Sequence, residues 1–142
     1  MDYYLVLPFV VALIEGERGG VLIGQHPYLP TKSYPGYWDL PGGKLEPDET
    51  PEQCIWREIQ EELCVEPIAL ALYGVYHHDR GHFLPEMRNM IPGLAIAYRV
   101  TINGAITPME QMNVHYAFRE ELIRIGPLST PWMRFFLKDM LK

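Results

Sequence analysis

The sequence lacks the features that mark membrane-spanning and secreted proteins. Its longest nearly unbroken apolar run, residues 5–14, is half the roughly 20 residues that a helix needs to cross a bilayer. No lysine or arginine precedes that run, and charged rather than small residues follow it, which is unlike a signal peptide. We therefore expect no membrane span and a cytoplasmic location.

Positive charge is also scarce. The chain has 12 lysines and arginines against 18 aspartates and glutamates, a net charge of −6. A protein that grips a nucleic-acid backbone needs a basic stripe, so we expect no nucleic-acid polymer among its partners. If a chain this acidic handles a phosphate substrate, a divalent cation is expected to stand between the two.

Cysteine is nearly absent, with Cys54 and Cys64 as the two representatives. They lie ten residues apart in or at the end of one predicted helix, which places them about 15 Å from each other at the helical rise. That separation is beyond the reach of a disulfide. The simplest interpretation is a protein of a reducing compartment.

The composition that remains is that of a globular protein. Apolar residues make up 48% of the 142 residues, enough to bury a core. No repeat, low-complexity stretch or polar linker divides the chain. We therefore expect a single domain over residues 1–142.

Alternating hydrophobicity and turn residues predict the elements in outline. Strands are expected at residues 4–14, 21–25, 37–40, 68–76, 91–102 and 105–106, and helices at 50–63, 120–125 and after 131. The 16–20 turn predicts that residues 21–25 pair back on the first strand, and Asn103-Gly104 predicts a second hairpin. Pro41-Gly42-Gly43 predicts irregular backbone. Strands separated by single helices indicate an α/β fold, a mixed sheet with helices on its faces.

The clearest helix is expected from Thr50 to Leu63. Thr50 is suited to be the N-cap, Pro51 the first helical residue, and Gln53 the partner in a capping box. Three apolar residues recur at helical spacing and predict an inward face: Trp56, Ile59 and Leu63. A last helix is expected to be capped by Ser129-Thr130-Pro131, with an apolar side that includes Trp132.

Three carboxylates share one face of the first helix, at Glu58, Glu61 and Glu62. One interpretation is a solvated acidic face. Against it, two like charges about 6 Å apart repel by roughly 3 kcal/mol at an effective dielectric of 20, and only Arg57 lies within the cluster to offset them. A hard cation removes the conflict, and Mg²⁺ or Mn²⁺ is the usual occupant of an all-oxygen site.

The residues around this cluster resemble the Nudix box, the signature of the Nudix hydrolases. Eight of the nine defined positions of G-x5-E-x7-R-E-U-x-E-E-x-G-U, where U is a bulky aliphatic residue, match between residues 43 and 65. The preceding stretch, Gly36 to Gly42, is similar to the approach to that box in MutT-type members. Cys64 stands where the family has glycine. A cysteine there either keeps a left-handed conformation at a cost of about 1 kcal/mol or lets the helix run on by one residue.

The resemblance implies an α/β/α sandwich and an enzyme that hydrolyses a phosphoanhydride bond of a nucleoside diphosphate linked to another group. It implies that Mg²⁺ or Mn²⁺ is held by four residues: the Gly42 carbonyl, Glu58, Glu61 and Glu62. It further implies that Arg57 orients a glutamate and that Glu49 supports the junction of loop and helix. Metals bridging the phosphates would lower the pKa of the water that attacks phosphorus.

The base that receives the proton of this water is left open between Glu58 and Glu110. Glu110 begins a stretch, EQMNVHYAFREEL, that is similar to a family segment in which this glutamate is an extra metal ligand or base. For the substrate, Trp38 is expected to stack on a base and Lys44 to contact phosphate, with ordinary packing and surface roles as the alternatives. The stretch from His77 to His82 matches no standard metal-ligand spacing.

Nucleoside triphosphates, including oxidised or non-standard ones, are the preferred substrates, with nucleoside monophosphate and pyrophosphate as products. Nucleotide-sugars or other diphosphate-linked nucleosides are the close alternative. A non-catalytic Nudix-like ligand-binding domain is the third, and it is disfavoured because the box keeps all its glutamates. A monomer or a homodimer is expected.

Overall fold

The computed structural model describes residues 5–84 and 89–142, and for residues 80–84 and 89 it describes the backbone alone. Its strands are β1 (Leu7–Leu13), β2 (Val21–Gln25), β3 (Trp38–Asp39), β4 (Gly42–Lys44), β5 (Glu66–Leu84), β6 (Asn89–Asn103) and β7 (Met112–Ala117). Its helices are α1 (Pro51–Leu63), α2 (Arg119–Ile125) and α3 (Pro131–Leu137), with short 3-10 turns at Gly126–Leu128 and Lys138–Leu141.

The strands form two sheets. One has the order β4-β1-β6-β5, in which β1 and β6 are parallel and the other pairs antiparallel. The second is an antiparallel sheet of order β3-β2-β7. The α/β fold with a mixed sheet is therefore confirmed. In the described part of the chain, no helix is both long and apolar enough to cross a membrane.

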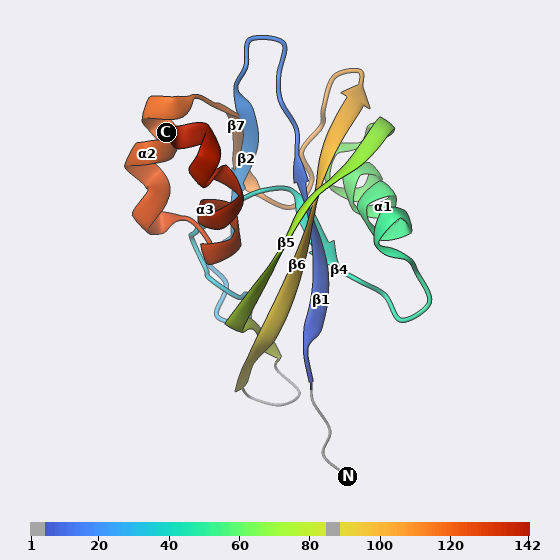
Figure 1. Cartoon of the computed structure of the whole chain (residues 1–142), viewed down its shortest axis with the longest axis vertical. Coiled ribbons are helices and arrows are strands. Elements are labelled where there is room, and N and C mark those ends of the chain that lie inside the picture. Colours follow the sequence, from blue (N-terminus) through green and yellow to red (C-terminus); the bar gives the residue numbers. More distant parts are fainter. Residues whose placement is uncertain (1–4, 85–88) are drawn as a thin grey trace.

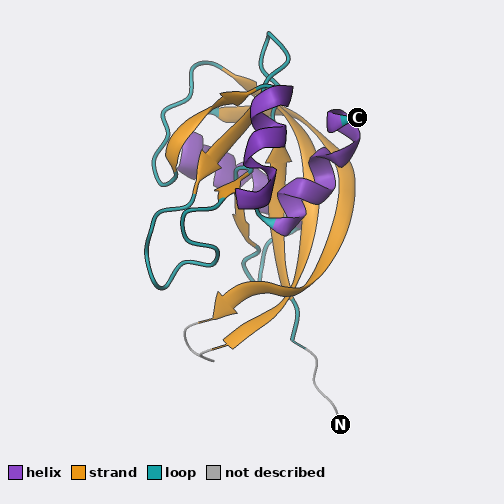
Figure 2. Cartoon of the chain, turned by 90° about the vertical axis from the view of Figure 1, so that its left-hand side faces the viewer, coloured by secondary structure: helices purple, strands orange, loops and turns teal. Residues whose placement is uncertain are grey.

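Strand β1 lies between two hydrophobic cores. Phe9, Val11 and Leu13 point into one core with residues of α2 and α3, whereas Val10 and Ala12 point into the other with residues of α1. This alternation follows from the two-residue period of a strand. Figure 1 shows the resulting layers, with α1 on one side of the sheet and α2 and α3 on the other. Figure 2, seen from the side of α2 and α3, shows the long strands passing behind them.

Both predicted hairpins are wrong. The turn at 16–20 closes and joins Glu15 to Val21 by a single bridge, but β2 then leaves β1 for the other sheet. The segment after Asn103-Gly104 does not return along β6 as a strand. The edges of β1 are already paired with β4 and β6, and those of β6 with β1 and β5. The pairing with β4 at Phe9–Val11 leaves no place for β2 along that part of β1. Residues 105–106 form no strand, although the end of β6 beyond Arg99 is not paired with β1.

Helix α1 begins as predicted, at a capping box. The Thr50 hydroxyl accepts from the Gln53 N–H at 3.2 Å, and the Gln53 side chain accepts from the Thr50 N–H at 2.8 Å. The predicted inward position of Trp56 is wrong, because this side chain is 40% exposed. Glu58 and Glu62 occupy part of the buried face instead, which turns Trp56 to its margin.

Three smaller predictions need correction or fall outside the structure. Gly42 and Gly43 are not irregular but belong to β4, paired with β1. Helix α3 begins after Thr130 as expected, yet the Thr130 hydroxyl makes no cap and donates to Asp39 instead. Tyr4, the predicted start of the first strand, lies outside the described residues.

Candidate active site

The site is built where β4 lies against α1. A side chain at Gly42 would collide with the backbone of Val10, and one at Gly43 would occupy the place of the Glu58 carboxylate. These two glycines therefore permit the strand to approach the helix closely enough for contact with its glutamates. At the same point the Gly42 N–H donates to the Glu62 carboxylate at 3.2 Å.

Arg57 links the carboxylates of this region to one another. Its Nε and Nη2 donate to the two carboxylate oxygens of Glu49 at 3.0 and 2.6 Å, a bidentate pair. Its Nη1 donates to Glu58 at 2.9 Å and to Glu61 at 3.2 Å. The hydrogen bond from Arg57 lowers the pKa of Glu49 to about 2. The guanidinium thus holds the loop before α1 and orients two glutamates of the cluster.

The carboxylates of Glu58 and Glu62 are almost fully buried, with relative exposures of 9% and 7%. Burial raises the pKa of Glu58 to about 7, opposed by Arg57 and reinforced by the charges of Glu61 and Glu110. Burial and the charge of Glu58 raise the pKa of Glu62 well above its ordinary value. The solvated acidic face considered for this helix therefore applies to neither residue.

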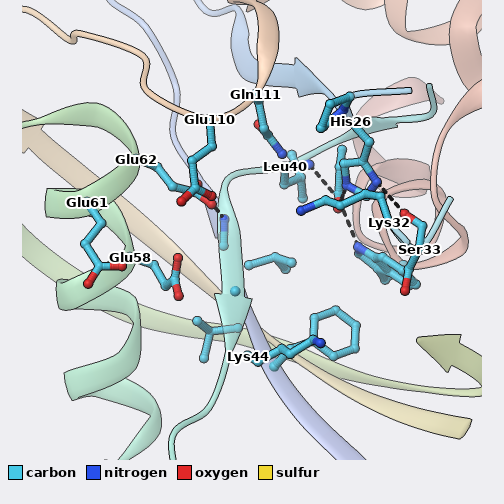
Figure 3. Close-up of a pocket in the computed structure, with 18 of the residues that line it drawn as sticks. His26, Lys32, Ser33, Leu40, Lys44, Glu58, Glu61, Glu62, Glu110 and Gln111 are labelled. Atoms are coloured by element: carbon cyan, nitrogen blue, oxygen red, sulfur yellow. Dashed lines mark hydrogen bonds and ion pairs between the residues drawn. The ribbon is translucent and has the colours of Figure 1, made fainter. Parts of the chain in front are cut away.

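Glu110 joins this cluster from a loop that is distant in sequence. The N–H groups of Thr107 and Met109 donate to the carbonyls of Leu63 and Glu62, at 2.8 and 2.9 Å. These two bonds fasten the loop to the last turn of α1. Glu110 consequently faces the helix glutamates, and its carboxylate points toward Glu62 in Figure 3.

A cavity of about 540 Å³ extends from the glutamates across β4. Glu58, Glu61, Glu62 and Glu110 line one end, together with the backbone of Gly42 and Gly43. Phe9, Leu40 and Lys44 also line it. The far end is lined by His26, Lys32 and Ser33, and by Asp39 and Trp132, which are hydrogen-bonded to this group. Figure 3 shows Lys32 and His26 across the cavity from the glutamates. The cavity thus joins an acidic end to an end that carries basic and aromatic side chains.

Asp39 organises the far end of the cavity and was not singled out in the sequence. Its Oδ1 accepts from the Leu40 N–H at 2.7 Å, the Thr130 hydroxyl at 3.0 Å and the Trp132 indole at 2.8 Å. Its Oδ2 lies 2.9 Å from Nε2 of His26. One buried carboxylate therefore ties β3, the loop after β2 and the start of α3 together.

Two predicted substrate residues differ in position. Lys44 lines the cavity. Trp38 is not among the residues that line it, and its indole packs edge-on against His115 with ring centroids 5.6 Å apart. Trp132 is buried in the core, as the sequence suggested, and it also lines the cavity.

Comparison with known proteins decides the family. The NUDIX domain matches residues 7–121. The chain belongs to the Nudix hydrolase family. It is 30% identical over 132 residues, 90% of either chain, to the CTP pyrophosphohydrolase of Escherichia coli. It is 39% identical over 74 residues to the 8-oxo-dGTP diphosphatase of Proteus vulgaris, a match that spans 51% of this chain and 63% of that protein.

The fold agrees with this assignment. The MutT protein of Methanosarcina mazei superposes with a TM-score of 0.77 and 22% identity, over 98% of this chain and 95% of that one. The MutT-like resemblance of the Nudix box is thus confirmed by sequence and by fold, and the chain is a hydrolase of phosphoanhydride bonds.

The departure from the Nudix box at Cys64 has a defined geometry. Cys64 caps the C-terminus of α1 with φ 56° and ψ 35°, and its N–H donates to the Gln60 carbonyl at 3.1 Å. Of the two options that the sequence left open, the left-handed cap is the one adopted. Cys54 is buried and Cys64 exposed, and both are free thiols.

The donor set of this Nudix hydrolase suits a divalent cation. All the donors at the acidic end are oxygens, as Mg²⁺ and Mn²⁺ prefer. Burial opposes the charged forms of Glu58 and Glu62, so an added cation would relieve an existing conflict. Within the described residues, no three His, Cys, Asp or Glu side chains are already gathered as a complete site.

Proposed function

We propose that this Nudix hydrolase cleaves nucleoside triphosphates, oxidised or non-standard ones included, to nucleoside monophosphate and pyrophosphate in a reaction that needs Mg²⁺ or Mn²⁺. The observation that carries the proposal is the cavity itself, which has four carboxylates at one end and basic and aromatic groups at the other. Its volume of about 540 Å³ is of the size that binds small molecules. The names of the two relatives, an 8-oxo-dGTP diphosphatase and a CTP pyrophosphohydrolase, support this substrate class.

The residues that would hold the ion are Glu58, Glu61, Glu62 and the carbonyl of Gly42. A bound divalent ion supplies charge neutralisation at the phosphates and acidifies a water molecule. Arg57 already orients Glu58 and Glu61 through hydrogen bonds, so it acts as their positioning residue. Lys44 lines the cavity and would contact a phosphate oxygen of the substrate.

Glu58 and Glu110 are the two candidates for the base that takes the proton of the attacking water. Glu58 has a pKa of about 7 in the metal-free protein, which suits a base at neutral pH, but it is also a proposed ligand. Glu110 lies across from it on the loop and is free of the helix. We favour Glu110, because a carboxylate that ligates an ion is a weaker acceptor of protons.

The stacking role expected of Trp38 stays a prediction. Its ring lies against His115, and Trp132, which lines the cavity, is only 1% exposed and packs against Phe9 and Tyr34. The free thiols fit the reducing, cytoplasmic location expected from the sequence.

The experiment that tests the proposal is a nucleotide library assayed with Mg²⁺ and a phosphate readout, with and without added pyrophosphatase. We expect phosphate from nucleoside triphosphates only when pyrophosphatase is present, because the released product is pyrophosphate. Glu62→Gln is the inactive control. Phosphate released without pyrophosphatase would contradict the proposal. A parallel assay with alkaline phosphatase in place of pyrophosphatase detects the phosphate monoesters that a nucleotide-sugar would release. Turnover confined to nucleotide-sugars in that assay would favour the alternative substrate class.

A further inference from the structure

His26 occupies a position that neither the Nudix box nor the glutamate cluster explains. It follows β2 directly, is 6% exposed, and lines the far end of the cavity. Its Nδ1 lies 2.8 Å from the carbonyl oxygen of Ser33 and 3.1 Å from that of Tyr34. Its Nε2 lies 2.9 Å from the Asp39 carboxylate. The imidazole therefore bridges β3 and the middle of the loop between β2 and β3.

These contacts determine how many protons the ring carries. A carbonyl oxygen can only accept, so Nδ1 must donate to Ser33 and Tyr34. A neutral ring would then set the lone pair of Nε2 against an oxygen of Asp39. An imidazolium satisfies both sides, because each nitrogen then donates. The same contacts account for the raised pKa of His26, in which the Asp39 bond and charge and the Ser33 carbonyl outweigh the opposing effect of burial.

The loop that His26 holds carries side chains into the cavity. Thr31, Lys32 and Ser33 line it, and Figure 3 shows Lys32 and Ser33 on the side opposite the glutamates. The ends of the loop are joined by backbone bonds, such as His26 N–H to the Tyr37 carbonyl at 2.8 Å. Its middle is tied to the His26 ring at Ser33, the neighbour of Lys32. The ring thus supplies a hydrogen-bonded link from this part of the cavity wall to Asp39, beside the packing of Tyr34 on Trp132.

We propose that His26 is a positioning residue for substrate binding: as an imidazolium clamped between Asp39 and the Ser33 carbonyl, it fixes the loop that presents Lys32 to the substrate. The inference rests on the proposed function and assigns a specific part of substrate affinity to this clamp. It predicts that loss of the His26 contacts raises KM, whereas the glutamates at the acidic end of the cavity determine kcat.

The first test is kinetic and uses His26→Gln. A glutamine cannot donate to both sides in the geometry of the ring, so we expect KM for the best nucleotide to rise about 10- to 100-fold, the range for a lost hydrogen bond to a charged group. We expect kcat to stay within about threefold and Mn²⁺ affinity to be unchanged. An unchanged KM, or a loss confined to kcat, would overturn the inference.

The matched control is His115→Gln. His115 makes the same kind of contacts, with Nδ1 2.7 Å from the Asn113 carbonyl and Nε2 2.9 Å from Glu121, but it does not line the cavity. If the effect came only from losing a histidine with hydrogen bonds at both ring nitrogens, it would appear in both variants. We expect KM to change in His26→Gln alone, and equal changes would contradict the inference.

The second readout is the pH profile of KM. Among the described residues, the charged groups that face His26 are Asp39 from β3 and Lys32 from its own loop. Loss of the proton on Nε2 at alkaline pH breaks the clamp, so KM of the unmodified protein should rise there. The profile of His26→Gln should lack this rise, and retention of the same rise would contradict the inference.

Nitrogen NMR of the imidazole rings gives a test that needs no variant to fold. We expect both ring nitrogens of His26 to be protonated at pH 7, and a neutral ring would overturn the inference. If no nucleotide is hydrolysed, the proposed function fails. The affinity for CTP with Mg²⁺, measured by calorimetry on both variants, then replaces KM and still decides the role of His26.

Discussion

Substitution of Glu58 by glutamine removes a buried negative charge. In the metal-free protein, burying this charge lowers the free energy of unfolding. The side chain is 11% exposed and lies near Glu61, Glu62 and Glu110. Its pKa rises from an ordinary 4.5 to about 7 on folding. The folded protein therefore binds a proton more tightly than the unfolded chain, and its stability falls as pH rises between these two values.

The size of the effect follows from that shift. At 1.36 kcal/mol per pKa unit, a rise from 4.5 to about 7 corresponds to about 3 kcal/mol of lost stability above pH 7. Glutamine has nearly the same shape and can still accept from Arg57, so Glu58→Gln should recover much of this amount. We expect a gain of about 2–3 kcal/mol at pH 8 and little at pH 4.5, where Glu58 is protonated in the folded protein and half-protonated in the unfolded chain.

The assay is urea unfolding in the presence of EDTA, followed by tryptophan fluorescence at pH 4.5, 6 and 8. The quantity of interest is the difference in unfolding free energy between variant and parent, in which titrating groups distant from Glu58 cancel. Glu61, Glu62 and Glu110 interact with its charge, so their relief is part of the expected gain. Glu61→Gln is the control. The Glu61 side chain is 55% exposed, so this substitution should change the stability little. Added Mg²⁺ should stabilise the parent more than Glu58→Gln.

A gain that is the same at pH 4.5 and pH 8 would refute this reasoning, because it could not come from the charge of Glu58. A loss of stability at pH 8 would refute it as well. It would mean that the hydrogen bond from Arg57 to the ionised carboxylate outweighs the burial of the charge.

Three further predictions concern the chemistry and the helix cap. Glu110→Gln should lower kcat by about 10² to 10⁴ with a smaller effect on KM in steady-state assays, as expected of a proton-transfer group, and a kcat near that of the parent would return the base to Glu58. Hydrolysis should stop in excess EDTA, return on addition of Mg²⁺ and rise toward alkaline pH, so turnover that persists in EDTA would contradict a metal site. Cys64→Gly should stabilise the protein by up to about 1 kcal/mol in urea unfolding, because residue 64 has φ 56°, whereas Cys64→Ala should bring no such gain.

Local signals made helix α1 and its carboxylates predictable from the sequence. The capping box spans four residues, from Thr50 to Gln53, and the glutamates at 58, 61 and 62 share a face through helical geometry alone. The family, the fold class and the acidic end of the cavity could therefore be predicted from residues 43–65. Glu110 was also found, because its segment resembles one in the family.

The far end of the cavity could not be predicted, because its contacts join distant parts of the chain. Asp39 meets His26 across 13 positions and Trp132 across 93. No spacing pattern in one sequence reports such contacts. The wrong hairpins have a similar origin, since turn residues indicate where the chain reverses but not which strand edges remain open.

The most direct test of a metal-dependent pyrophosphohydrolase at the glutamate cluster is the hydrolysis rate of Glu62→Gln. The measurement is the release of pyrophosphate from a nucleoside triphosphate with saturating Mg²⁺, compared between this variant and the parent, with circular dichroism to confirm that both are folded. We predict a fall in kcat of several orders of magnitude in a folded protein. A folded variant that hydrolyses the nucleotide at the rate of the parent would contradict the assignment of the site.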